Sequence, residues 1–179
     1  MTKEEVIQLA SETGVKAAME FMSQERQRAQ QAIADRRLWN TKLLLKNYRS
    51  FVAHVENAVF TLDDPVPLEE IWSDLMTPGR DSSLRVESIK QSAARTATIV
   101  KHIKTMLDLY KVYCVTMGSP EDQRRWRIIN ALYISENRRA IKELAQEEGV
   151  VERTIYKDID IACERISALM FGIDGLQRR

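Results

Sequence analysis

The chain has 179 residues, of which 44% are hydrophobic and 30% are charged, so it can form a packed core and is not an intrinsically disordered chain. Its 27 Lys and Arg residues nearly balance 26 Asp and Glu residues, and the formal net charge of +1 argues against a histone-like protein that binds nucleic acid by bulk charge. The low content of 6 glycines and 4 prolines disfavours turn-rich β folds and predicts an all-α fold.

The sequence also argues against a membrane, secreted or cofactor-dependent protein. It contains no apolar run of the roughly 18 residues that span a bilayer, and its first residues lack the apolar segment of a signal peptide. Its two cysteines, Cys114 and Cys163, form neither a disulfide framework nor a metal-ligand motif. We therefore expect a cytoplasmic protein with no membrane partner, no metal and no cofactor.

Residues 1–60 form the first of four predicted regions, a long N-terminal helical region with one glycine and no proline. From Leu38 to Val59, apolar residues recur at steps of three, four or seven, which predicts an amphipathic helix. The almost wholly polar residues 23–31 are interpreted as either a solvated stretch of helix or a weak linker.

Two predicted regions follow in the middle of the chain. Residues 61–81 are acidic and contain prolines, which predicts a linker that carries one short helix. Residues 82–118 have the most regular apolar spacing in the sequence, with steps of three and four from Val86 to Cys114, and predict one long amphipathic helix. We expect this helix to pack against residues 38–59, so that the long helices form a hairpin or bundle.

Residues 119–179 are predicted to form a C-terminal domain with three helices, over about 121–134, 139–147 and 152–171. The last two helices are joined by a connection so short that they must cross steeply. Such a crossing needs a small residue on the first helix and a residue in the turn that tolerates a positive φ.

Ala145 and Gly149 meet these two requirements, and Ile155 stands where the third helix must pack back on the second. The A-x3-G-x5-I spacing therefore predicts a helix-turn-helix, a motif whose second helix enters the major groove of DNA. An all-α chain with long N-terminal helices and a C-terminal helix-turn-helix domain is the expected architecture.

The outward positions at the start of the third helix are the candidate base-reading residues, because arginine can pair with guanine, threonine can contact a thymine methyl group and glutamate can accept from cytosine. They are Glu152, Arg153, Thr154, Tyr156 and Lys157. Three cations near the second helix, Arg138, Arg139 and Lys142, are candidate phosphate contacts. The alternative interpretation is that these charges only solvate the surface.

A basic and aromatic segment in the N-terminal region is a candidate surface for RNA polymerase or for a second copy in a homodimer. Its residues are Arg36, Arg37, Trp39, Lys42, Lys46 and Arg49. The alternative is that the aromatic side chains belong to the core or a dimer interface, with the cations extended along apolar surface into solvent.

Two stretches of the sequence resemble phage and prophage transcriptional regulators of the ArpU/RinA type, whose helix-turn-helix is similar to region four of sigma factors. The stretches are RTIYKDIDIACERISALMFGIDGL, residues 153–176, and DRRLWNTKLLLKNYRSFVAHVENAV, residues 35–59. The resemblance implies a cytoplasmic DNA-binding regulator that activates late viral genes and can contact RNA polymerase. It places the recognition helix at residues 151–157.

Two positions depart from the pattern of that family. Glu148 stands before the turn glycine, where an apolar residue is usual, and Val151 stands where a capping serine or threonine is usual. Without a capping oxygen, the start of the recognition helix loses about 1 kcal/mol. We therefore expect this helix to fray until DNA or a partner binds.

The sequence favours a binding protein over an enzyme, because it contains no phosphate-binding glycine loop, nucleophile elbow or HExxH motif, and its two histidines, His54 and His102, belong to no metal-spaced cluster. The leading hypothesis is a sequence-specific transcriptional regulator that binds double-stranded promoter DNA, as a phage late-gene activator. One alternative is a sigma-like factor that recruits core RNA polymerase. The other is an oligomeric phage packaging subunit that recognises a packaging site.

Overall fold

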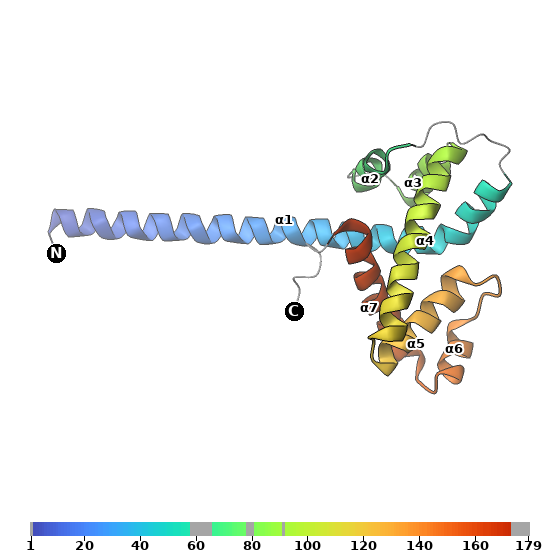
Figure 1. Ribbon diagram of the computed structural model, residues 1–179. Coiled ribbons are helices and arrows are strands. Elements are labelled where there is room, and N and C mark those ends of the chain that lie inside the picture. Colours follow the sequence, from blue (N-terminus) through green and yellow to red (C-terminus); the bar gives the residue numbers. More distant parts are fainter. Residues whose placement is uncertain (1, 58–65, 78–80, 91, 173–179) are drawn as a thin grey trace. The chain divides into compact units, whose positions relative to one another are not determined.

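A computed structural model describes residues 2–57, 66–77, 81–90 and 92–172, and these residues form an all-α fold, as predicted (Figure 1). The elements are α1 (Lys3–Glu56), α2 (Leu68–Met76), α3 (Ser82–Lys90), α4 (Ala93–Thr116), α5 (Pro120–Ile129), the π-helical turn η1 (Asn130–Ile134), α6 (Ile141–Glu147) and α7 (Glu152–Phe171). None of the described helices is both long enough and apolar enough to cross a membrane. Residues 61–65 and 78–80 of the acidic linker, residues 58–59 of one resembling stretch and the closing Ile-Asp-Gly-Leu of the other lie outside the described residues.

The chain divides into two compact units, residues 1–36 and residues 37–179, and the boundary falls inside α1. This division differs from the predicted boundaries at residues 60, 81 and 118. The reason is that α4, α5 and α7 share one hydrophobic core with the second half of α1, so none of these helices forms a domain of its own. In the first unit, the polar residues 23–31 are helical and exposed, and therefore form no linker.

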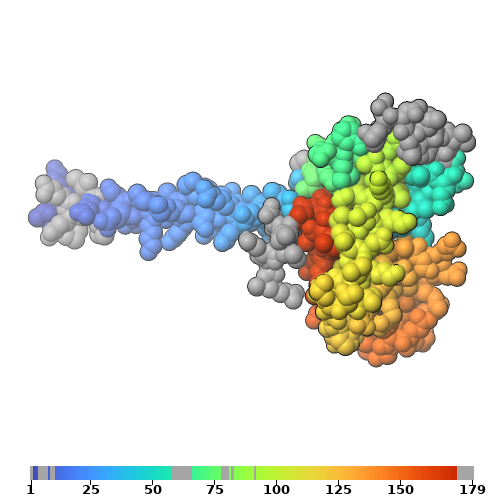
Figure 2. Space-filling view, viewed as in Figure 1, coloured from blue at the N-terminus to red at the C-terminus, as the bar shows by residue number. Residues whose placement is uncertain are grey.

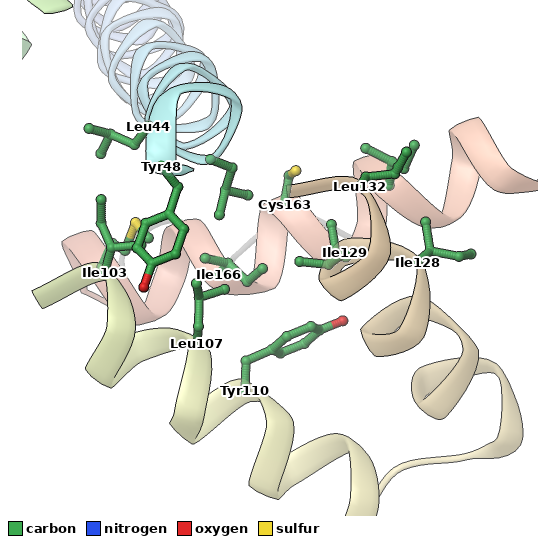
Figure 3. Close-up of a cluster of buried hydrophobic side chains, with 14 of the residues drawn as sticks. Leu44, Tyr48, Ile103, Leu107, Tyr110, Ile128, Ile129, Leu132, Cys163 and Ile166 are labelled. Atoms are coloured by element: carbon green, nitrogen blue, oxygen red, sulfur yellow. The ribbon is translucent and has the colours of Figure 1, made fainter. Parts of the chain in front are cut away.

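The core of the second unit forms where side chains from α1, α4, α5 and α7 meet (Figure 3). Leu44 and Tyr48 of α1 lie beside Ile103 and Leu107 of α4. The same stripe of α4 packs on α7, and Figure 2 shows these two helices side by side on one face of the unit. The main helix-to-helix contacts of α4 are with α7, α5 and α3, while α1 contributes side chains to the same core. The hairpin or bundle expected from the apolar spacing of residues 38–59 and 82–118 therefore stays a prediction.

The long helix predicted over residues 82–118 is two helices in the structure. Ser92 has an extended backbone, with φ −137° and ψ 146°, and its hydroxyl accepts a hydrogen bond of 3.0 Å from the backbone N–H of Arg95. Ser92 is therefore the N-cap of α4, and α3 ends two residues earlier. The apolar pattern continues across this break because Ile89 before it and Ile99 after it enter the same core.

A buried arginine joins α1, α2 and α3. The side chain of Arg85 is 5% exposed and donates hydrogen bonds to Oδ1 of Asn40 (2.9 Å), to the carbonyl oxygen of Thr77 (2.8 Å) and to that of Leu75. Its guanidinium also lies 4.9 Å from the ring centroid of Trp39. A buried cation needs this many acceptors because its lost hydration is otherwise uncompensated.

We expect the substitution Arg85→Ala to lower the free energy of unfolding by about 3 kcal/mol, because it leaves acceptors on α1 and at the end of α2 without their donor. Urea denaturation followed by circular dichroism measures the change. Arg153→Ala is the matched control, since Arg153 is exposed and its removal should change stability by less than about 0.5 kcal/mol. Equal effects of the two substitutions would contradict this role for Arg85.

Candidate nucleic-acid interface

The connection between α6 and α7 is a tight turn built around one glycine. Gly149 has φ +64°, which a residue without a side chain adopts at little cost. The backbone N–H of Val150 donates to the carbonyl oxygen of Ala145 (2.9 Å), and that of Gly149 donates to the carbonyl oxygen of Gln146 (3.3 Å). This pair of bonds is a Schellman motif, which ends α6 and turns the chain sharply into α7.

The two helices pack on the core through the residues that the sequence pattern identified. Ala145 is buried at 6% exposure, and Leu144 beside it is buried as well. Ile155, in the first turn and a half of α7, is fully buried. The buried residues of α7 define its inner face, and the remaining side chains of its first turns form the outer face.

On the buried side of α7, the carboxylate of Asp158 sets the position of this helix against α5. The side chain of Asp158 is 3% exposed and accepts hydrogen bonds from Nε of Arg124 (2.7 Å) and Nε of Arg125 (3.0 Å). Removing a carboxylate from water is costly unless charged donors replace the lost hydration. The two arginines of α5 therefore fix both the rotation and the axial position of α7.

A second acidic group, Asp122, extends this network to α4 and to the far half of α7. Its carboxylate is paired with Arg125 on the same helix and with Arg165 of α7, at 2.5 Å and 2.6 Å. Burial raises the pKa of Asp122, but hydrogen bonds from Arg125 and from the backbone of Ser119 outweigh it and hold the pKa below its usual value. Arg165 also lies over the ring of Tyr113 of α4, 5.3 Å from its centroid.

The charged residue before the turn glycine has a specific partner. Both carboxylate oxygens of Glu148 accept hydrogen bonds from Arg127 of α5, at 2.7 Å and 2.6 Å. These bonds hold the pKa of Glu148 below its usual value, and they raise that of Arg127. An apolar residue at position 148 would pack on the core. In this chain, a bidentate ion pair between Glu148 and Arg127 attaches the turn to α5 instead.

Val151, the other departure from the family pattern, is the N-cap of α7 and supplies no side-chain hydrogen bond. Its extended backbone, with φ −81° and ψ 153°, still allows its carbonyl oxygen to accept from the N–H of Thr154 at 2.8 Å. The side chain of Val151 is 68% exposed. The first turn of α7 thus lacks the side-chain cap that a serine or threonine would provide, as the sequence indicated.

The five candidate base-reading residues all lie in the first turns of α7. Glu152, Arg153, Tyr156 and Lys157 are exposed, and Thr154 is half-buried. Tyr156 presents more than half of its side chain to solvent. In the part of the chain that the structure describes, no ion pair holds Arg153 or Lys157, so both cations are available to a ligand.

The three candidate phosphate contacts are exposed near the start of α6, but they are not equivalent. Arg139 forms an ion pair with Glu147, whereas Lys142 has no ion-pair partner among the described residues. Burial lowers the pKa of the Arg49 guanidinium, and the nearby positive charge of Arg138 lowers it further. One candidate phosphate contact, in the segment before α6, is therefore near one candidate of the α1 surface.

The candidate polymerase or dimer surface is largely engaged inside the protein. Arg49 donates to the carbonyl oxygens of Ser135 (2.7 Å) and Ala131 (3.3 Å), and so supports the connection from η1 to α6. Lys42 forms an ion pair of 2.7 Å with Asp160 of α7. Trp39 stacks under Arg85, Arg37 is half-buried and Lys46 is exposed. Arg36 belongs to the first unit, where it is half-buried.

Sequence reasoning missed the acidic residues that position this segment. Asp158 was indistinguishable from the exposed charges around it, because helical spacing alone does not reveal which acidic side chain meets a pair of arginines. A signal for it did exist: Asp158 lies three residues after Ile155, on the buried face of α7. Glu148 was recognised as unusual, but its partner Arg127 lies on another helix.

The described residues contain no group of three His, Cys, Asp or Glu side chains that could hold a metal ion. Both cysteines are buried thiols, and burial raises the pKa of Cys163 to about 12. Comparison with protein-family models, with curated proteins and with solved structures finds no match to this chain. The functional argument therefore depends on the α6–turn–α7 segment.

We expect Glu148→Gln to lower the free energy of unfolding by about 1 kcal/mol at pH 7, because it removes an ion pair whose arginine is half exposed. Since the folded-state pKa of Glu148 is depressed, its stabilisation is present above the unfolded value and is lost as the pH falls through the folded value. The difference between wild type and variant should therefore shrink as the pH falls from 7 to 3.

Urea denaturation at pH 7 and pH 3 measures both values. Glu164→Gln, which makes the same change at an exposed position of α7, is the control and should have little effect at either pH. A difference for Glu148→Gln that persists unchanged at pH 3 would show that the Arg127 pair is not its source.

Proposed function

We propose that this protein is a sequence-specific DNA-binding transcriptional regulator, with α6 and α7 as its helix-turn-helix and α7 as its recognition helix. The observation that carries the proposal is the first two turns of α7. They expose Arg153, Tyr156 and Lys157 together, while Ile155 and Asp158 anchor the opposite face of the same turns. A helix end with an anchored inner face, exposed cations and a polar aromatic side chain is suited to the major groove of DNA.

Each exposed side chain has a defined part in this proposal. Arg153 would donate two hydrogen bonds to a guanine, and Lys157, one turn further on, would reach a second base or the phosphate beside it. Glu152 would accept from a cytosine and disfavour other bases by repulsion. Thr154 is half-buried, so its part is limited to a thymine methyl group or a phosphate oxygen.

Phosphate contacts would come from the start of α6. Lys142 and Arg138 are exposed cations beside the segment, and Arg139 would contribute by exchanging Glu147 for a phosphate oxygen. A formal net charge of +1 gives weak non-specific binding, because neutralised phosphates supply most of that affinity. The proposal therefore includes a homodimer, in which a second module adds affinity and sequence information.

The resemblance to ArpU/RinA-type regulators supports a narrower form of the proposal, a cytoplasmic phage protein that activates late genes and contacts RNA polymerase. An independent activator should shift promoter DNA alone. A sigma-like factor should instead co-purify with core polymerase and start transcription without a resident sigma factor. A packaging subunit should form a ring of many copies.

Two alanine substitutions test the DNA proposal on a target selected from random double-stranded DNA. Arg153→Ala should weaken binding to that target by about 1–3 kcal/mol and relax the preference at one base pair. Lys142→Ala should weaken binding to all sequences alike and reduce the slope of log K against log salt by about one. Fluorescence anisotropy at several salt concentrations measures both effects.

Lys104→Ala is the matched control, because Lys104 is an exposed cation on α4, outside the α6–turn–α7 segment. It should leave the base preference unchanged. Failure to select any target sequence, or a selected target that Arg153→Ala binds as tightly as wild type does, would contradict the assignment of α7 as the recognition helix.

A further inference from the structure

The first unit carries a stripe of exposed apolar side chains along one side of α1. Val15, Met19, Met22 and Ile33 are 44% to 67% exposed, and Ala29 lies between the last two of them on the same side. Together with Arg26, these residues follow each other at steps of four, three, four, three and four. This alternation is the spacing of the contact positions in a two-helix coiled coil.

The opposite side of the same helix carries Glu20, Gln24, Gln27 and Gln31, and all four are exposed. Phe21, 63% exposed, is the large apolar side chain of this segment that lies outside the stripe. In proteins, the packing of its apolar side stabilises an amphipathic helix more than its intrinsic helix propensity does. A row of exposed Val, Met and Ile side chains, interrupted only by Arg26 and Ala29, is the kind of surface that a second apolar helix can cover.

Two adjacent charges, one in the stripe and one at its edge, define what that helix must carry. Arg26 occupies a contact position of the stripe, and Glu25, the residue before it, lies about 100° further round the helix, where it flanks the stripe. Glu25 is already bonded to Arg28 of the same helix at 2.9 Å, but this pair is largely exposed and its carboxylate has room for a second donor. A partner helix must therefore bring a cation level with Glu25 and an anion level with Arg26.

A second copy of this chain meets that requirement. When two parallel copies pack in register, Arg26 of each lies in the seam beside the flanking Glu25 of the other, so the stripe and its edge are complementary to a second copy in charge as well as in polarity. The segment from Arg36 to Arg49 was the earlier candidate for a dimer surface, but Lys42 and Arg49 are engaged by α7 and η1. The apolar stripe of the first unit has no such partners among the described side chains.

We propose that this protein forms a homodimer through the apolar stripe of residues 15–33, with two ion pairs between Glu25 and Arg26 fixing the register. The inference rests on the homodimer of the proposed function and assigns the surface that forms it. A single buried polar position in an otherwise apolar seam costs stability but selects one alignment of the helices.

Sedimentation equilibrium of the full chain without DNA tests the proposal. Wild type should have twice the 20.7 kDa mass of one chain. Met22→Glu, which places a charge in the stripe, should shift it to the monomer, whereas the control Gln24→Glu, with the same charge on the opposite side of the helix, should remain a dimer. A monomeric wild type, a mass of three or more chains, or a dimeric Met22→Glu variant would overturn the proposal.

Charge reversal tests the register independently of apolar packing. Arg26→Glu should raise the dimer dissociation constant by about tenfold or more, because it sets like charges against each other. The double variant Glu25→Arg/Arg26→Glu should recover the dimer, since it exchanges the two partners. Mixing Glu25→Arg with Arg26→Glu should give the heterodimer. If the double variant stays as weak as Arg26→Glu, the paired register is wrong.

These results are independent of the DNA proposal. If the wild type is a dimer, Met22→Glu is a monomer and no target DNA can be selected, the dimer proposal stands and the assignment of α7 as the recognition helix fails. If the wild type is a monomer that binds a selected target, the recognition helix stands and the dimer proposal fails.

Discussion

The carboxylate of Asp158 constrains the whole C-terminal part of the protein, because a buried negative charge is stable only where donors replace its hydration. Arg124 and Arg125 are consecutive residues of α5, and both reach this one carboxylate. Any rotation of α7 about its axis would separate the charge from at least one of them. The choice of which side chains of α7 face solvent therefore follows from this contact as much as from the apolar residues around it.

The turn before α7 is held by two contacts of different kinds. Gly149 provides the backbone conformation that lets α6 end and the chain reverse, and Glu148 attaches the turn to α5 through Arg127. Together with Asp158, these contacts leave the first two turns of α7 without a side-chain cap but with a fixed inner face. Their outer face is thus free to contact a ligand, while α5 supports the helix from behind.

Much of the candidate site could be predicted because its signals are local. Ser119 and Pro120 mark the start of α5, and Gly149 marks the turn, each through a backbone requirement that its neighbours cannot change. The break at Ser92 was missed because the apolar stripe runs through it and a hydroxyl can cap a helix or lie on its surface. The engagement of Lys42 and Arg49 was missed because their acceptors, Asp160 and Ser135, lie about a hundred residues away along the chain.

The sequence by itself determined that the chain is all-α and where α7 lies, because helical periodicity is a property of neighbouring residues. It placed the first two C-terminal helices only approximately, since residues 130–134 form the separate turn η1 and α6 begins at Ile141. Only the tertiary structure decided which charged side chains have partners inside the protein and which remain exposed. Asp158, Glu148 and Arg49 acquire their partners from other helices, and the cost of burying a charge makes those partners obligatory. Arg153 and Lys157 remain exposed because no such partner faces them among the described residues.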